Sequence, residues 1–253
     1  MKKLFILIFI AFVAFSCSSQ GPKPNEIWYT SNDGNTIQPG WDGGFGANII
    51  SNIYKDGKGV ITFDKELTSI GFGAFLSCSS LTSITIPDSV TFIGDSAFEN
   101  CTSLTSITIP NNVTSIKQDA FKNCTSLTSI IIPDSSIHTY IGVNAFRNCV
   151  SLTDITIGNR NTSIGLYAFK DCTSLTSVTI PNNVSLLASG AFSGCTSLKE
   201  IYCERVTPPE GGINMFYGNA LERKIYVPIG SGEVYKTTQY WSEWCDYIEE
   251  KEF

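Results

Sequence analysis

The sequence has few of the residues on which most enzymes and metal sites depend. It contains one histidine, His138, and none of its nine cysteines forms a Cys-x-x-Cys pair, which argues against zinc. It has no Gly-x-x-x-x-Gly-Lys phosphate loop. A nucleophilic Ser/His/Asp or Cys/His arrangement would have to use His138, which lies in the loop stretch from Ser135 to Tyr140. We therefore expect no catalytic activity, no metal and no cofactor.

Basic residues are also too few for a nucleic-acid partner. The chain has 17 Lys and Arg against 23 Asp and Glu, a net charge of −6, and no basic stripe that would neutralise phosphates. Asp33 and Asp42 stand beside glycines, but too few oxygen ligands follow at the spacing of a calcium loop. Turn formation explains these aspartates better.

No apolar run is long enough to span a bilayer, which takes about 20 residues. The longest begins at Leu4 and has twelve residues; Lys2 and Lys3 precede it, as in a signal peptide, here residues 1–16. The sequence Ala14-Phe15-Ser16-Cys17 resembles the bacterial lipoprotein box, although Ala14 stands where that box usually has leucine. The resemblance implies that Cys17 is lipidated, with residues 17–24 as a flexible tether. The alternative is an ordinary secretory cleavage site with an incidental cysteine.

What the sequence has in abundance is one repeated unit. The stretch CTSLTSITIP at 101–110 recurs with few changes from Cys78, Cys124 and Cys172. Ala-Phe pairs recur from Ala74 to Ala191 at steps of 23, 23, 25, 23 and 23 residues, and a cysteine follows each alanine by four residues. A fixed period of this length is typical of a solenoid, in which stacked copies bury a face that one copy cannot bury alone.

Each copy predicts a short strand, because isoleucines alternate with polar residues before a proline ends the run. The isoleucines should point inward and the threonines toward solvent. We expect eight parallel strands, which begin near Ile61, Ile84, Ile107, Ile130, Ile155, Val178, Ile201 and Ile225. At about 4.8 Å per strand, they would form a wall roughly 34 Å long.

The unit Leu-x-x-Ile-x-Ile-Pro followed by Ala-Phe-x-x-Cys resembles the BspA-type leucine-rich repeats of exported proteins in anaerobic bacteria, over residues 25–253. The resemblance implies an α/β repeat solenoid, either a leucine-rich-repeat horseshoe or a flat right-handed solenoid with a parallel strand wall. It also implies a surface protein, since some members of the family adhere to host matrix proteins or to other cells. The asparagine that usually follows the strand is missing, so we do not infer an asparagine ladder.

Both ends of an open solenoid need a cap. We assign residues 25–59 to an N-terminal hairpin cap, with turn signals at Asn32-Asp33-Gly34-Asn35 and Asp56-Gly57. Residues 60–228 form the solenoid, and residues 229–253 form a helical C-terminal cap. Its helix should run from Glu233 to Glu249, with apolar residues at helical spacings: Val234, Tyr240, Trp241, Trp244 and Ile248.

The repeat cysteines occur at one fixed site per unit, so their side chains should lie parallel in an internal column. An exported compartment permits disulfides, but parallel Cβ vectors are poor geometry for a bridge. We expect small buried side chains with free thiols. Cys203 should point inward from a strand, and Cys245 should lie in the cap, partly exposed.

The outward strand positions are mostly serine and threonine, and the pattern breaks toward the C-terminal end. There we predict a ligand-binding patch of Asp154, Glu200, Tyr202 and Tyr226, because tyrosine is enriched at binding hot spots. Ordinary sequence drift near a cap would also explain these residues.

The sequence thus predicts an exported protein, anchored to the outer membrane by lipid and facing either the cell exterior or the periplasm. Its strand wall would bind a protein or a glycan, such as a host matrix protein or another cell surface. The alternative is a structural spacer or assembly partner in an envelope complex. A glycan-active enzyme is a third hypothesis, which the missing carboxylate and histidine constellations argue against. The sequence does not indicate an oligomeric state.

Overall fold

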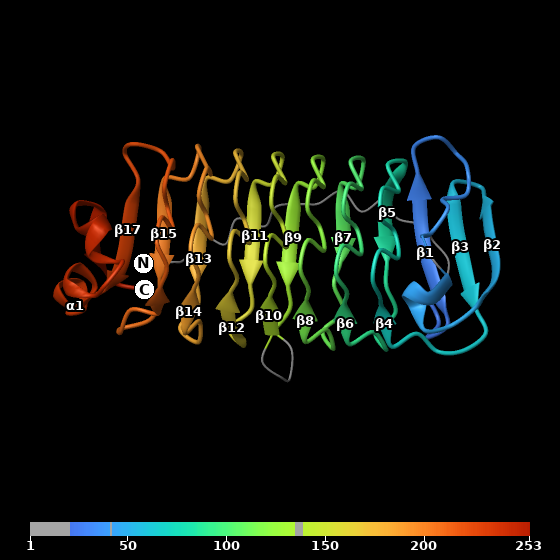
Figure 1. The fold of residues 1–253 in the computed structure, drawn as a ribbon, viewed down its shortest axis with the longest axis horizontal. Coiled ribbons are helices and arrows are strands. Elements are labelled where there is room, and N and C mark those ends of the chain that lie inside the picture. The colour runs from blue at the N-terminus through green and yellow to red at the C-terminus, as the bar shows by residue number, and fades with distance from the viewer. Residues whose placement is uncertain (1–20, 41, 135–138) are drawn as a thin grey trace, which may run out of the picture.

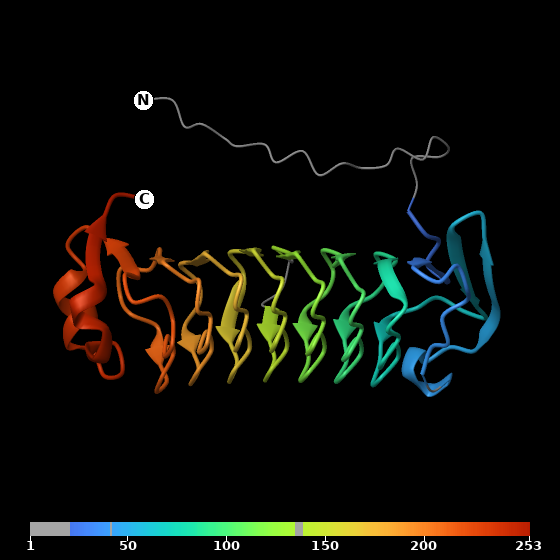
Figure 2. The ribbon, with the colours of Figure 1, turned by 90° about the horizontal axis from the view of Figure 1, so that it is seen from above.

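The structure, a computed structural model, describes residues 21–40, 42–134 and 139–253. The expected signal peptide, Cys17 and His138 lie outside the described residues. The described chain is an elongated stack of coils with strands along two of its sides (Figures 1 and 2). The stack is nearly straight, so of the two expected shapes, a horseshoe and a flat solenoid, the structure has the flat one.

One strand of each coil lies along the first side of the stack. Paired neighbours are parallel, in a register that aligns equivalent residues, such as Ile84 with Ile107 and Ile201 with Ile225. These strands are β5 (Leu81–Thr85), β7 (Ser106–Thr108), β9 (Ser129–Ile132), β11 (Asp154–Ile157), β13 (Ser177–Ile180), β15 (Glu200–Cys203) and β17 (Lys224–Pro228). Their inward residues are buried and the residues between them, Ile131 included, point outward, as expected. We call the outward positions of these strands the strand face.

A second parallel sheet, which the sequence analysis did not predict, lines another side. Its members are β4 (Ser69–Ile70), β6 (Phe92–Ile93), β8 (Ser115–Ile116), β10 (Thr139–Ile141), β12 (Asn161–Ile164), β14 (Leu186–Leu187) and β16 (Glu210–Gly211). Most of these strands have two residues, too few to show a period of two. The coils approach closely just after them: a Cβ on Gly142 would lie 2.6 Å from the backbone carbon of Lys117.

Each coil turns through residues with a left-handed backbone. They recur immediately before each Ala-Phe pair, as at Asp119 with φ +55°, and two residues after its phenylalanine, as at Asn123 with φ +61°. Glycine, asparagine, aspartate and serine fill nearly all of these sites, because a β-branched or bulky side chain is strained there. The exception is Tyr167, with φ +56°.

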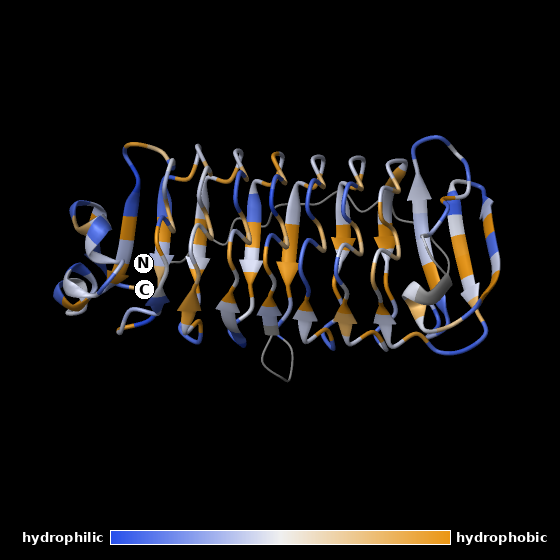
Figure 3. Ribbon diagram, viewed as in Figure 1, coloured by the Kyte–Doolittle hydropathy of each residue, from blue (hydrophilic) through white to orange (hydrophobic). Residues whose placement is uncertain are grey.

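The core between the sheets contains a column of phenylalanine rings and a second column of cysteine thiols. From Phe75 to Phe192 successive rings stack with centroids 5.0–5.2 Å apart and planes within 3–6°. Apolar residues recur at matching levels in successive coils (Figure 3). The repeat cysteines are buried and free, which confirms that prediction, and Cys245 is half-buried.

The structure adds that these thiols are hydrogen-bond donors. The Sγ–H of Cys124 donates to the carbonyl of Phe98 in the preceding coil, at 3.2 Å, and that carbonyl also accepts the backbone N–H of Cys101, at 3.1 Å. The same thiol bond recurs at Cys101, Cys149, Cys172 and Cys195. In the last coil Asn219 replaces the cysteine, and its amide donates to the Phe192 carbonyl at 3.2 Å.

Hydroxyl groups fasten neighbouring coils in the same direction. The Oγ1–H of Thr105 donates to the carbonyl of Thr82 at 3.0 Å, and that of Thr128 donates to the carbonyl of Thr105 at 3.3 Å. These bonds give the recurring threonines of the repeat a structural role.

A short asparagine ladder, which the sequence analysis did not infer, lies at one corner of the coils. There the Asn123 amide donates to the Asn100 side chain at 2.8 Å and accepts from Asn148 at 2.9 Å. This short ladder lies beside the cysteine column rather than after the strand.

The N-terminal cap is antiparallel, which corrects the prediction of a parallel strand near Ile61. Its elements are β1 (Glu26–Ser31), the 3₁₀ helix η1 (Asp42–Phe45), β2 (Ile49–Lys55) and β3 (Lys58–Phe63). The turn at Asp56-Gly57 sends β3 back along β2, so that hairpin is confirmed and β3 pairs antiparallel with both β1 and β2. The turn signal at Asn32–Asn35 closes no hairpin, because β1 pairs with β3 and β5 instead.

The C-terminal cap contains less helix than expected. Instead of one helix over 233–249, it has α1 (Gly232–Thr237), the 3₁₀ helix η2 (Ser242–Tyr247) and the strand β18 (Ile248–Lys251). Thr238 is extended, with φ −74° and ψ 139°, and its hydroxyl donates a hydrogen bond to the Val234 carbonyl at 2.6 Å. This side-chain bond competes with the backbone hydrogen bonds that would continue the helix.

The buried side of this cap differs from the expected one only in part. Trp241, Trp244 and Ile248 are buried, whereas Val234 is 42% exposed and Tyr235 is buried in its place. Among the described residues, no helix has the length and apolar character needed to cross a membrane.

Candidate functional site

One row of outward side chains runs along the whole strand face and into the N-terminal cap. Strand pairing places Thr85 beside Thr108, Ile131 beside Thr156, and Thr179 beside Tyr202, which is followed by Tyr226. At the other end Trp28 lies opposite Thr85, Val60 opposite Trp28, and Ile53 opposite Val60. Aromatic residues therefore occur toward both ends of a row that is otherwise largely threonine.

The structure brings three of the four predicted site residues together. The rings of Tyr202 and Tyr226 stack with centroids 5.0 Å apart and planes at 25°. The Tyr202 hydroxyl donates to Oε2 of Glu200 at 3.0 Å. Burial, reinforced by Glu200, raises the pKa of Tyr202 to about 12, so this phenol stays protonated at neutral pH. We call Glu200, Tyr202, Tyr226 and Lys251 the tyrosine cluster.

Lys251 and its neighbours were missed by the sequence analysis. Its Nζ lies 4.8 Å from the ring centroid of Tyr202 and 4.4 Å from that of Tyr226, a cation–π arrangement. The ring of Phe253 meets Tyr202 edge to face, with centroids 6.4 Å apart. No repeat motif marks residues 248–253, so the sequence held no signal that this segment extends the sheet as β18.

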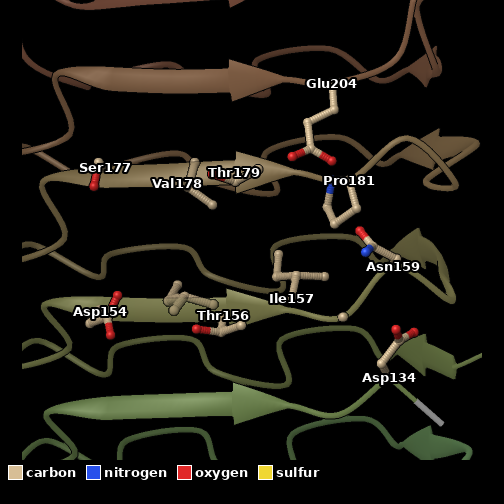
Figure 4. Close-up of a pocket in the computed structure, with 12 residues that line it drawn as sticks. Asp134, Asp154, Thr156, Ile157, Asn159, Ser177, Val178, Thr179, Pro181 and Glu204 are labelled. Carbon is tan, nitrogen blue, oxygen red and sulfur yellow. The ribbon is translucent and has the colours of Figure 1, made fainter. Parts of the chain in front are cut away.

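Asp154, the fourth predicted residue, lies apart from this cluster. It is on β11, two strands from β15, which corresponds to about 10 Å at the usual strand spacing. It lines a shallow depression of about 440 Å³ together with Asp134, Ser177, Thr179 and Glu204 (Figure 4).

The depression is polar, and its charges are acidic. Asp154 lies at the start of β11, whereas Asp134 and Glu204 lie near the carboxyl ends of their strands (Figure 4). Gly158, where neighbouring repeats have proline, has no room for a side chain: a Cβ would lie 2.6 Å from the backbone nitrogen of Asp134. In the part of the chain that the structure describes, no three His, Cys, Asp or Glu side chains gather as a metal site.

The N-terminal end of the row has its own aromatic site, which the sequence analysis assigned only to a cap. The Nζ of Lys58 lies 3.1 Å from the ring centroid of Trp28. The indole N–H donates to Oε2 of Glu26 at 3.2 Å. Burial lowers the pKa of Lys58. The Lys58 amine thus covers the face of the Trp28 indole, whereas the Lys251 amine lies farther from the two tyrosine rings.

Comparison with known proteins supports the fold. The family model described as BspA type leucine rich repeat region matches in six copies, over residues 54–172 and 134–238. A crystal structure of a leucine-rich repeat protein of T. pallidum is 31% identical, with a TM-score of 0.58, and the match covers 70% of this chain and 81% of that one. A leucine-rich repeat protein of Eubacterium ventriosum is 25% identical, with a TM-score of 0.47, over 61% of this chain and 35% of that one.

No curated protein matches the sequence. The family model nevertheless covers well over half of the chain, and the coils that it matches carry the repeated Ala-Phe-x-x-Cys unit. The chain therefore belongs to the BspA-type leucine-rich repeat family.

Proposed function

We propose that this chain is a noncatalytic, exported cell-envelope lipoprotein that binds a protein or a glycan through its strand face. The observation that carries the proposal is the tyrosine cluster. Half-buried tyrosines stacked beside a lysine stand on a face that is otherwise mostly serine and threonine. Rigid aromatic side chains supply large contact area at a low entropic cost, and tyrosine is enriched among residues that dominate binding.

The proposed anchor is Cys17, the first residue after the signal peptide. A protein held by lipid at this site would present the solenoid either outside the cell or toward the periplasm. Protease treatment of intact cells, followed by blotting, separates these placements. Loss of the protein supports surface exposure and an adhesin role, whereas cleavage only after lysis contradicts it. Removal of the anchor in Cys17→Ser should release the protein from the membrane fraction.

The binding proposal is tested with a double variant, Tyr202→Ala with Tyr226→Ala. Its matched control is Thr85→Ala with Thr108→Ala, which truncates two outward residues of the same row far from the cluster. Binding to arrays of matrix proteins and glycans should fall by about 30-fold for the tyrosine variant, since hot-spot residues contribute about 2 kcal/mol or more. Circular dichroism should show an unchanged fold. Equal binding by the two variants would contradict the proposal.

A spacer or assembly partner in an envelope complex is the second candidate. The nearly straight stack of coils, bonded to one another by side chains in each repeat, favours it, because such a stack holds its two ends at a fixed separation (Figure 2). The tyrosine variant distinguishes the candidates: a spacer should keep its function without the tyrosine cluster.

A further inference from the structure

The strand β2 leaves one edge of the N-terminal sheet unpaired. The sheet order is β2-β3-β1-β5-β7, which puts β2 outermost, and Figure 1 shows it at the end of the molecule opposite α1. An unpaired edge presents backbone N–H and C=O groups that can accept another strand.

The edge strands at the two ends of the molecule differ in how many charged residues they carry. At the C-terminal end the edge strand β18 carries Glu249, Glu250 and Lys251, the kind of charges that discourage strand addition. The sequence of β2 is IISNIYK, in which Lys55 is the one charged residue. Ile50 and Ile53 are 66% and 60% exposed on it. β2 is therefore the open edge.

From Ser51 to Lys55 the side chains of β2 alternate between the core and the outer face, whereas the register shifts between Ile49 and Ser51 and leaves Ile50 exposed there. Asn52 and Tyr54 face the core: Asn52 accepts a hydrogen bond from the buried Tyr29 hydroxyl at 2.7 Å, and the Tyr54 ring lies 5.8 Å from the Tyr29 ring. Ile53 faces outward and ends the row that continues through Val60 to Trp28. A strand added to this edge would cover Ile53.

Charge placement points to a second copy of the chain as the added strand. The carboxylate of Asp64 lies at the start of β2, where it accepts the backbone N–H and the side-chain amide of Asn48 at 2.9 and 2.6 Å. Lys55 lies at the other end of β2, and both charged side chains are exposed. Among the described residues neither of them forms an ion pair.

We propose that the chain forms a two-fold dimer by antiparallel pairing of β2 with β2 of a second copy, centred on Asn52. In this register Lys55 of each copy reaches the bulged start of β2 in the other copy, where that copy's Asp64 lies beside Asn48. The two-fold axis repeats the Lys55–Asp64 contact, and Ile53 lies opposite Ser51. Interfaces of this kind, in which one patch meets itself, are the commonest in soluble oligomers.

The dimer is expected to be weak. Two paired strands and a few side chains bury less than the roughly 1,600 Å² of a standard stable interface, so association should depend on concentration. Because the axis is perpendicular to the sheet, both strand faces point to the same side. Two binding faces would then act together, which raises avidity without any new contact to the ligand.

A charge swap tests the register. Lys55→Glu sets two carboxylates against each other at the contact, and Asp64→Lys sets two amines against each other, so each variant alone should dimerise roughly tenfold more weakly. In an equimolar mixture the mixed dimer pairs the new glutamate of one variant with the new lysine of the other. Its second contact keeps the original Lys55 and Asp64, so the mixed dimer should recover the original affinity. Sedimentation velocity of the purified full chain, with one variant fluorescently labelled, measures both effects.

A third variant controls for local damage, because Asp64→Lys also removes the bonds to Asn48. Ile53→Lys adds a charge to the edge and leaves those bonds intact, so it should prevent the dimer. A wild-type protein that stays monomeric at its highest soluble concentration would overturn the proposal. A dimer that survives Ile53→Lys, or a mixture that shows no recovery, would overturn it as well.

Discussion

The hydrogen-bonding role of the buried thiols can be tested by replacing Cys124, which has no solvent exposure. In Cys124→Ala the sulfur is lost, at a cost comparable to a buried methylene, about 0.8 kcal/mol. The bond to the Phe98 carbonyl is lost too. That carbonyl keeps the Cys101 N–H, so this second cost lies near the low end for a hydrogen bond, about 0.5–1 kcal/mol. Together the free energy of unfolding should fall by about 1.3–1.8 kcal/mol.

The comparison with serine decides whether the bond matters. A buried hydroxyl without a partner costs about 1–3 kcal/mol, whereas one that donates to a carbonyl loses little. Since the Phe98 carbonyl is available, Cys124→Ser should be more stable than Cys124→Ala. Cys203 is the matched control: it is 1% exposed, but among the described residues its thiol makes no hydrogen bond. There the order should reverse, with Cys203→Ala more stable than Cys203→Ser.

Equilibrium unfolding in urea, followed by circular dichroism, measures all four variants. Cys245→Ala, at a half-buried site, should change stability by less than about 0.5 kcal/mol and sets the baseline. If the serine and alanine variants rank in the same order of unfolding free energy at Cys124 and at Cys203, the reasoning is refuted. The thiols would then contribute only as buried apolar groups.

Three further predictions concern the coils. Burial raises the pKa of Cys78 to about 11 and that of Cys149 to about 12. As the pH rises, such thiols ionise in the unfolded chain, near pH 8.5, before they ionise in the folded chain. Their full contribution to the free energy of unfolding should therefore be present below that pH and fall above it by about 1.4 kcal/mol per pH unit for each thiol. Urea titrations between pH 8 and 10 should show a shallower fall in Cys149→Ala, and a flat profile in the wild type would contradict this. Gly190→Ala should cost about 1–2 kcal/mol of stability in thermal unfolding, because φ at this residue is +61° and the new Cβ would clash with the Tyr167 ring. The cost should shrink when Tyr167→Asn is added. An equal cost with and without Tyr167→Asn would exclude the ring contact as its cause. Asn123→Gly keeps the left-handed backbone but removes both amide bonds, so it should lower the unfolding free energy by about 1–2 kcal/mol, and an unchanged urea midpoint would show that the ladder contributes nothing.

The solenoid was predictable because every coil meets a copy of itself. A residue that must be small, such as Ala120, or large and apolar, such as Phe121, then recurs at the same place in each unit. The period alone therefore predicted the stacked column of rings and the parallel arrangement of the thiols. It also predicted the inward isoleucines of β5 to β17.

Elements without such copies were predicted less well. The direction of β3 depends on the sheet that β1 forms between it and β5, a contact between distant segments that no local pattern encodes. The prediction of one helix over 233–249 was wrong because the same apolar spacing also suits a bent segment. In that segment threonine hydroxyls compete for the backbone carbonyls that a longer helix would use. The short strands such as β6 are stable only through their neighbours on each side.

The candidate site was predicted in part for the same reason. Tyr202 and Tyr226 are equivalent residues of adjacent coils, so their proximity followed from the repeat. Lys251 joins them from β18, outside the repeat, and could not be placed. Asp154 shares the face but not the cluster, because β13 lies between β11 and β15.

The hydrogen bonds that threonine and cysteine side chains make between coils have one direction, and this bears on how such a chain can lengthen. In the repeat, threonine and cysteine donors reach back to carbonyls of the preceding coil. The first of these thiols, Cys78, finds its acceptor in Gln38 of the N-terminal cap, whereas Tyr235 and Trp241 of the C-terminal cap donate to Arg205 and Pro209 of the last coils. In these bonds the N-terminal cap supplies the acceptor and the C-terminal cap supplies the donors. A gene duplication that inserts a whole 23-residue unit between the caps leaves these threonine and cysteine donors matched, so the molecule can change its reach without redesigning either end.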